Sequence, residues 1–115
     1  MSAYLSFEAI QNYFSEEDFV IATCQQIHKD LAGLVNTFQA LKIDFSEDVY
    51  PQLETHLKEI LLGLNDSNLQ QFVYQVDLKE DLFLNAISAQ DEYEELSFLI
   101  IQREAQKVYF KIQYS

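Results

Sequence analysis

Two histidines, His28 and His56, are the residues of this chain best suited to metal binding or proton transfer. Histidines and carboxylates on facing helices can bind a metal ion, and Glu59 lies about one helical turn from His56. The di-iron bundle pattern needs a glutamate three residues before each of two histidines, but Gln25 and Leu53 occupy those positions. We therefore expect no metal site and no cofactor, and we expect both histidines to face solvent.

Other sequence patterns that are typical of enzymes fail in the same way. A phosphotransfer histidine is followed by lysine three residues later and glycine four residues later, whereas Leu31 and Ala32 follow His28 at these distances. The single cysteine, Cys24, cannot form an internal disulfide, and it falls on the core-facing side of a predicted helix, which favours a buried apolar role over a catalytic thiol. The sequence has no glycine-rich phosphate loop and no nucleophile elbow. We predict that the protein is not an enzyme.

The charge of the chain constrains its partners. Among 115 residues, 19 are acidic and 7 are basic, which gives a formal net charge of −12 at pH 7, while 49% are hydrophobic. The hydrophobic fraction supports a packed core, and the negative field repels nucleic-acid phosphates and anionic lipids. We therefore expect neither nucleic acid nor membrane as a partner, and we mildly favour a basic protein. The simpler explanation, that the acids only keep the protein soluble, stays open.

The N-terminal sequence MSAYLSFEAI lacks the basic and long apolar regions of a secretory signal. The longest nearly apolar run, residues 96–101, is too short to cross a membrane. We therefore expect a cytoplasmic protein.

The scarce positive charge is concentrated in one row near the C-terminus, where Arg103, Lys107 and Lys111 stand four residues apart. On a helix, Arg103 and Lys107 lie between the apolar patches of a second face, opposite the core-facing stripe. That stripe is expected to contain Phe98, Ile101, Ala105, Val108, Tyr109 and Ile112, and the second face Leu96, Leu99, Ile100, Phe110 and Tyr114. Because a surface helix needs only one apolar face, the second face has to be covered by the same chain or by a partner. Alternatively, the cations only stabilise the negative end of their own helix.

Apolar residues spaced three or four apart divide residues 1–115 into five or six predicted helices, forming a single all-α domain with a long C-terminal helix. The first helix is expected from about Ala3 to Phe14. The second begins at a capping pair, Ser15 and Asp18, and continues to Leu41. Its apolar seam consists of Val20, Cys24, Ile27, Leu31, Leu34, Phe38 and Leu41. Such a seam fits a coiled-coil dimer or, as we prefer, a compact bundle.

Proline and capping residues divide the rest of the chain. Pro51 belongs in the first turn of the third helix, and residues 65–67 separate the third helix from the fourth. The last two helices are expected to begin at the capping pairs Asp77 with Glu80 and Asp91 with Glu94. The segment VYFKIQY also alternates as a strand does, but no second convincing strand is available to pair with it, so a helix is predicted.

The segments FVYQVDLKED and LIIQREAQKVYFK resemble the pattern LLYRIDVxE … LIIxRxxQKxxxR of a family of small, uncharacterised bacterial helical proteins. Gln75 and Lys111 stand where that pattern has arginine. The resemblance implies a helical fold, a bacterial source and no known activity. The residues that match are Phe72, Val73, Tyr74, Val76, Asp77, Arg103, Gln106 and Lys107.

These features predict a non-catalytic, cytoplasmic interaction protein that self-associates or binds a protein partner through its last helix. The residues expected to contact the partner are Arg103, Lys107, Phe110, Lys111 and Tyr114. The alternative is an acidic immunity or inhibitor protein that covers a basic site on a nuclease toxin.

Overall fold

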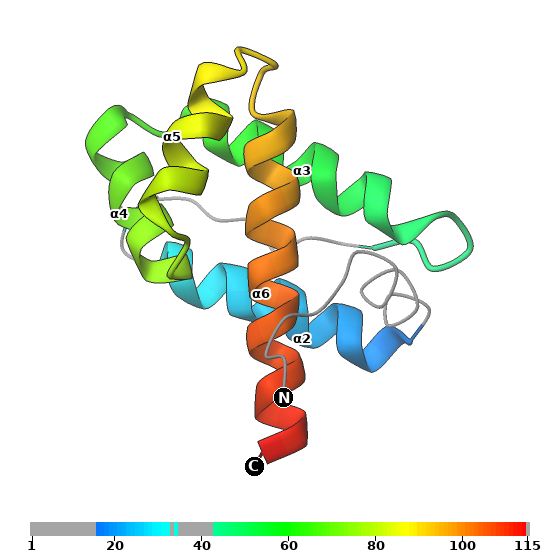
Figure 1. The fold of residues 1–115 in the computed structure, drawn as a ribbon. Coiled ribbons are helices and arrows are strands. Elements are labelled where there is room, and N and C mark those ends of the chain that lie inside the picture. Colours follow the sequence, from blue (N-terminus) through cyan, green and yellow to red (C-terminus); the bar gives the residue numbers. More distant parts are fainter. Residues whose placement is uncertain (1–15, 33, 35–42, 115) are drawn as a thin grey trace.

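The protein is described by a computed structural model at residues 16–32, 34 and 43–114 (Figure 1). The helices in this part of the chain are α2 (Glu17–Leu31), α3 (Val49–Gly63), α4 (Asp66–Val76), α5 (Glu80–Ser88) and α6 (Glu94–Tyr114). The predicted all-α bundle with a long C-terminal helix is confirmed, since α6 has 21 residues and no strand occurs among the described residues. The helix predicted at residues 3–14 lies outside them.

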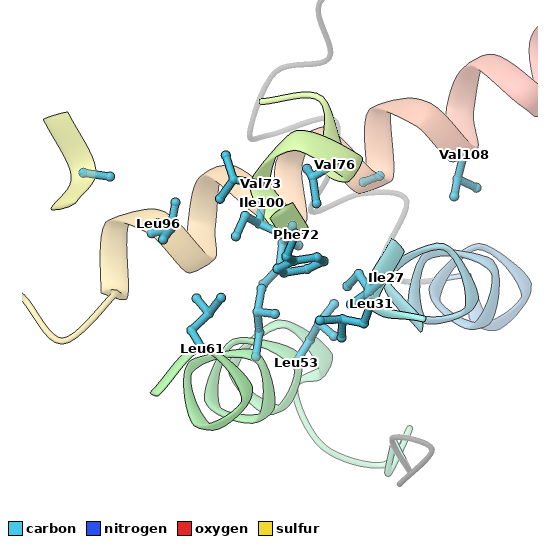
Figure 2. Close-up of a cluster of buried hydrophobic side chains, with 14 of the residues drawn as sticks. Ile27, Leu31, Leu53, Leu61, Phe72, Val73, Val76, Leu96, Ile100 and Val108 are labelled. Atoms are coloured by element: carbon cyan, nitrogen blue, oxygen red, sulfur yellow. The ribbon is translucent and has the colours of Figure 1, made fainter. Parts of the chain in front are cut away.

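Helix α6 contacts each of the other four described helices, and it crosses α3 and α2 in Figure 1. Its C-terminal turns extend past α2. Between α2, α3, α4 and α6 lies the apolar core, in which Phe72 is fully buried beside Leu53 and Leu61 (Figure 2). The burial of these large side chains removes apolar surface from water and holds the helices together.

The boundaries of α3 and α4 follow local chemistry. Pro51 lies in the first turn of α3, as predicted, where its missing amide donor costs no helical hydrogen bond. Asn65 caps α4, because its side chain accepts a hydrogen bond of 2.7 Å from the backbone amide of Asn68. The spacing of apolar side chains three or four residues apart predicts one buried side for α4, and the structure confirms it. This side consists of Leu69, Phe72, Val73 and Val76.

The predicted Asp77–Glu80 cap of α5 is wrong. Asp77 instead ends α4 in the left-handed conformation, with a φ of 66°, and its amide donates to the carbonyls of Val73 and Tyr74. Aspartate tolerates this conformation better than most residues. Lys79 takes the cap position of α5, without a side-chain hydrogen bond to the helix.

The prediction that the second helix continues to Leu41 is also wrong. Helix α2 ends at Leu31, because Ala32 adopts extended backbone angles and Gly33, a poor helix former, comes next in the sequence. Leu34 therefore lies beyond the helix, and Phe38 and Leu41 are outside the described residues. The long seam that also suited a coiled coil is interrupted after Leu31.

Both predicted faces of α6 contribute to the core over its first half. Leu96 and Ile100, from the second face, and Ile101, from the first face, are all fully buried. The helix begins close to the predicted cap, because the Asp91 carboxylate accepts a hydrogen bond of 3.1 Å from the amide of Glu95. The prediction for Ile112 is wrong, because this residue is 59% exposed.

Candidate functional site

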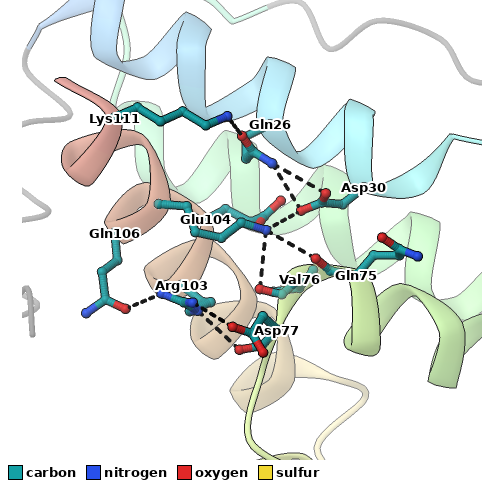
Figure 3. A network of polar contacts seen from close by, with 10 residues as sticks. Gln26, Asp30, Gln75, Val76, Asp77, Arg103, Glu104, Gln106 and Lys111 are labelled. Carbon is teal, nitrogen blue, oxygen red and sulfur yellow. Dashed lines mark hydrogen bonds and ion pairs between the residues drawn. The ribbon is translucent and has the colours of Figure 1, made fainter. Parts of the chain in front are cut away.

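The three cations of α6 bind other parts of the same chain (Figure 3). The guanidinium of Arg103 donates to the Asp77 carboxylate at 2.9 Å and to the Asp77 carbonyl at 3.1 Å. A further donor of the same side chain contacts the Gln106 side-chain oxygen at 2.8 Å. Arg103 therefore fastens α6 to the residue that ends α4.

Lys107, one turn further along α6, binds the same end of α4. Its ammonium donates to the carbonyls of Gln75 and Val76 at 3.2 and 3.3 Å. These carbonyls are left without intrahelical partners at the C-terminus of α4, where the helix dipole is negative. Lys107 and Arg103 together thus cap a helix other than their own, through the carbonyls of residues 75–77.

The ammonium of Lys107 also lies between two carboxylates. It is 2.6 Å from the Oδ2 atom of Asp30, on α2, and 2.9 Å from the Oε1 atom of Glu104, on its own helix. Glu104 is fully buried and Asp30 is 8% exposed, so neither group is well solvated. We call Asp30 and Glu104 the buried carboxylate pair.

The pKa values of the two carboxyl groups are shifted in opposite directions. Burial, with the neighbouring Asp30 carboxyl group as a further cause, raises the pKa of Glu104 to about 8. The pKa of Asp30 is lowered, because the neighbouring Glu104 carboxyl group, the Lys107 ammonium and the Gln26 amide together outweigh the opposing effect of burial. Near neutral pH, the pair therefore holds one proton, on Glu104, and Lys107 balances the charge of Asp30.

Gln26 connects the buried carboxylate pair to the protein surface. Its amide nitrogen donates to the two carboxylate oxygens of Asp30 at 3.4 and 3.3 Å, and its amide oxygen accepts from Lys111. Lys111 is exposed, whereas Gln26 is buried. A continuous set of polar contacts thus runs from Glu104 through Lys107, Asp30 and Gln26 to Lys111 (Figure 3).

Next to Lys111, α2 and the end of α6 enclose a groove of about 420 Å³, which we call the terminal groove. Val108 and the exposed Ile112 give it an apolar part, and Lys29 and Lys111 give it positive charge. Neither lysine forms an ion pair with a carboxylate in the described part of the chain. The residues lining the groove are Ala22, Gln25, Gln26, Lys29, Val108, Lys111 and Ile112.

The other predicted partner-binding residues differ in their surroundings. Phe110 is half-buried, and its ring is tilted against that of Tyr109 with 5.9 Å between the centroids. Tyr114 is the last residue of α6, and its side chain lies outside the described part of the structure. Among the predicted residues whose side chains are described, Lys111 alone lines the terminal groove, while Arg103 and Lys107 bind the end of α4.

A second cavity, of about 240 Å³, lies between α2 and α3. Its lining is mainly apolar and includes Cys24, Leu57, His28 and His56. His28 is exposed, but the prediction that His56 faces solvent is wrong, because this side chain is half-buried against the cavity. Burial raises the pKa of the Cys24 thiol to about 11, so the thiol is neutral.

Sequence reasoning missed the buried carboxylate pair. Glu104 stands four residues after Ile100 and four before Val108, so it occupies a position of an apolar stripe. A glutamate at a position where the helix pattern expects an apolar side chain indicates a buried polar contact. The partner of Glu104 was not detectable, since Asp30 is 74 residues away in the sequence (104 minus 30) and only packing brings them together.

Among the described residues, no three His, Cys, Asp or Glu side chains are grouped as metal ligands would be. No helix in this part of the chain is sufficiently long and apolar to cross a membrane. Comparison of the chain with protein-family models, with curated proteins and with solved structures finds no match.

Proposed function

We propose that this protein is a non-catalytic interaction module that binds a protein partner at the terminal groove. The partner segment carries an apolar side chain, which covers Ile112, and a carboxylate, which pairs with Lys111 and Lys29. The observation that supports this proposal is the presence of two lysines without a described carboxylate partner beside an exposed isoleucine, in a chain of net charge −12.

Fewer residues are proposed to contact the partner than the sequence predicts. Arg103 and Lys107 already have acidic and carbonyl partners within the chain, so a docking segment would have to displace those contacts in order to use them. Lys111 has only the neutral side chain of Gln26 as its described partner, and a carboxylate is a stronger partner for an ammonium.

Replacing Ile112 with aspartate tests this surface without disturbing the core. The matched control is Leu62→Asp on α3, because Leu62 is also exposed, at 62% against 59% for Ile112. Wild type and both variants would be immobilised and incubated with host extract, and the bound proteins would be identified by mass spectrometry. We expect to find a partner protein that binds the wild type and Leu62→Asp but does not bind Ile112→Asp or Lys111→Glu. The Kd of this partner would then be measured with the purified proteins.

Sedimentation of the same variants determines whether the partner is a second copy of the chain. Self-association through the groove predicts a wild-type mass above that of the monomer, and a monomeric Ile112→Asp variant. The proposal is wrong if Ile112→Asp keeps both the mass and the bound proteins of the wild type. Deleting residues 107–115 is a poorer test, because it also removes Lys107 and the buried Val108.

A second candidate function is the acidic inhibitor of a basic toxin. It is favoured by three consecutive exposed acids at the start of α2, Glu16, Glu17 and Asp18. Salt separates the two candidates: association steered by this acidic surface slows strongly in high salt, whereas docking of an apolar segment on Ile112 changes much less.

A further inference from the structure

The contact between α2 and α6 depends on three ionisable groups that share a poorly solvated site. Lys107 supplies one positive charge, while Asp30 and Glu104 supply two carboxyl groups. With one proton on the pair, the site is neutral overall. When the proton leaves for solvent, two carboxylates face a single ammonium, and the site carries one uncompensated negative charge in a buried position.

We propose that Asp30, Glu104 and Lys107 form a proton-dependent latch between α2 and α6, closed when the carboxylate pair holds one proton and released when both carboxylates are charged. Release separates the C-terminal half of α6 from α2, which lets water reach Glu104. The pKa of Glu104, about 8, places this change slightly above neutral pH.

Among the described residues, no cation other than Lys107 forms an ion pair with either carboxyl group. From α2, Asp30 and the neutral Gln26 face the site, and from α6, Lys107 does. Helix α4 contributes the carbonyls of Gln75 and Val76, which bind the same ammonium. Arg103 is paired with Asp77 at the end of α4, and no charged side chain of α3 or α5 in the described part of the chain pairs with either carboxyl group.

The latch also reaches the terminal groove, because Gln26 bonds Asp30 with its amide nitrogen and Lys111 with its amide oxygen. Opening the contact between α2 and α6 therefore disrupts the groove that these two helices form. This consequence for partner binding rests on the proposed function above, whereas the latch itself does not.

Amide hydrogen exchange at pH 6 and pH 9, corrected for the intrinsic rate, measures release of the latch. We expect residues 105–112 of α6 and 26–30 of α2 to lose about a hundredfold in protection, since pH 6 lies about two units below the Glu104 pKa of about 8 and each unit changes the opening equilibrium about tenfold. Carbon NMR of the Glu104 carboxyl in the wild-type chain supplies a second measurement, with an expected midpoint of about pH 8.

Two variants make the exchange experiment decisive. Glu104→Gln keeps the shape of the protonated side chain but cannot lose a proton, so its protection should be the same at both pH values. Asp77→Asn removes the adjacent, largely exposed ion pair and should keep the pH response of the wild type. The latch is refuted if Glu104→Gln loses protection as the wild type does, or if Glu104 titrates below pH 6. Neither measurement involves a partner, so failure of the latch is distinguishable from failure of groove binding.

Discussion

Arg103 on α6 pairs with Asp77 at 2.9 Å and also binds the Asp77 carbonyl, so that one helix caps the end of another. Lys107 extends this arrangement to the carbonyls of Gln75 and Val76. The spacing of four residues between Arg103 and Lys107 places both cations on one side of α6, facing the end of α4. The regular row of cations in so acidic a chain therefore has a structural role, whether or not a partner binds beside it.

Replacing Asp77 with alanine should lower the free energy of unfolding by about 1–2 kcal/mol. Alanine loses the ion pair with Arg103, and it also fits the left-handed backbone at this position poorly. Asparagine tolerates that backbone, so Asp77→Asn should cost less than about 1 kcal/mol. Urea unfolding of the two variants measures the difference, and equal losses would show that the backbone conformation contributes nothing.

Replacing Lys107 with methionine should be among the most destabilising changes at the surface of α6, at about 3–5 kcal/mol. Methionine keeps the length of the side chain but leaves the Asp30 carboxylate without its counter-ion in a buried site. The matched variant is Lys111→Met, which removes an exposed cation and should change the stability by less than about 0.5 kcal/mol. Similar effects of the two substitutions in urea unfolding would contradict this assignment.

Stability should fall as the pH rises from about 4.5 to about 8, because burial raises the pKa of Glu104 from 4.5 to about 8. In this range the folded protein holds a proton that the unfolded chain has lost, so the free energy of unfolding decreases by up to about 1.4 kcal/mol per pH unit. Above pH 8, both states are deprotonated and this contribution levels off.

The variant Glu104→Gln isolates this contribution. In this variant, the free energy of unfolding should not decline as the pH rises. The stability of Glu104→Gln relative to the wild type should therefore increase from pH 5 to pH 9. Asp30 acts in the opposite direction: because its pKa is lowered, its stabilising effect is present above the ordinary value of 3.8 and is lost as the pH falls through the lowered pKa. Chemical unfolding at several pH values measures both effects, and parallel curves for wild type and Glu104→Gln would contradict the assignment to Glu104.

The thiol of Cys24 should react slowly with an aromatic disulfide reagent at pH 8 in the folded protein. Burial raises its pKa to about 11, so the fraction present as the reactive thiolate is small. In urea, the thiol regains its ordinary pKa and should react much faster. Equally fast reaction in both conditions would show that the cavity between α2 and α3 does not protect this residue.

The sequence by itself determined the helical class and most helix positions, because these depend on nearby residues. Pro51 correctly marked the start of α3, and the spacing of Leu69, Phe72, Val73 and Val76 correctly gave the buried side of α4. The separation predicted at residues 65–67 is shorter in the structure, since α4 already begins at Asp66. One local signal misled: Asp77 was expected to start α5 but ends α4, in the left-handed conformation and with its amide bonded to the carbonyls of Val73 and Tyr74.

Only the tertiary structure decided what the cations of α6 contact. Nothing local relates Lys107 to Asp30, or Arg103 to Asp77, since these pairs are 77 and 26 residues apart. The burial of Glu104 likewise depends on how α2 and α4 pack against α6. The sequence supplied the charges and the helices that carry them, while packing between distant helices selected the partner of each charge and its pKa, because electrostatic energies depend on distance and solvation in three dimensions.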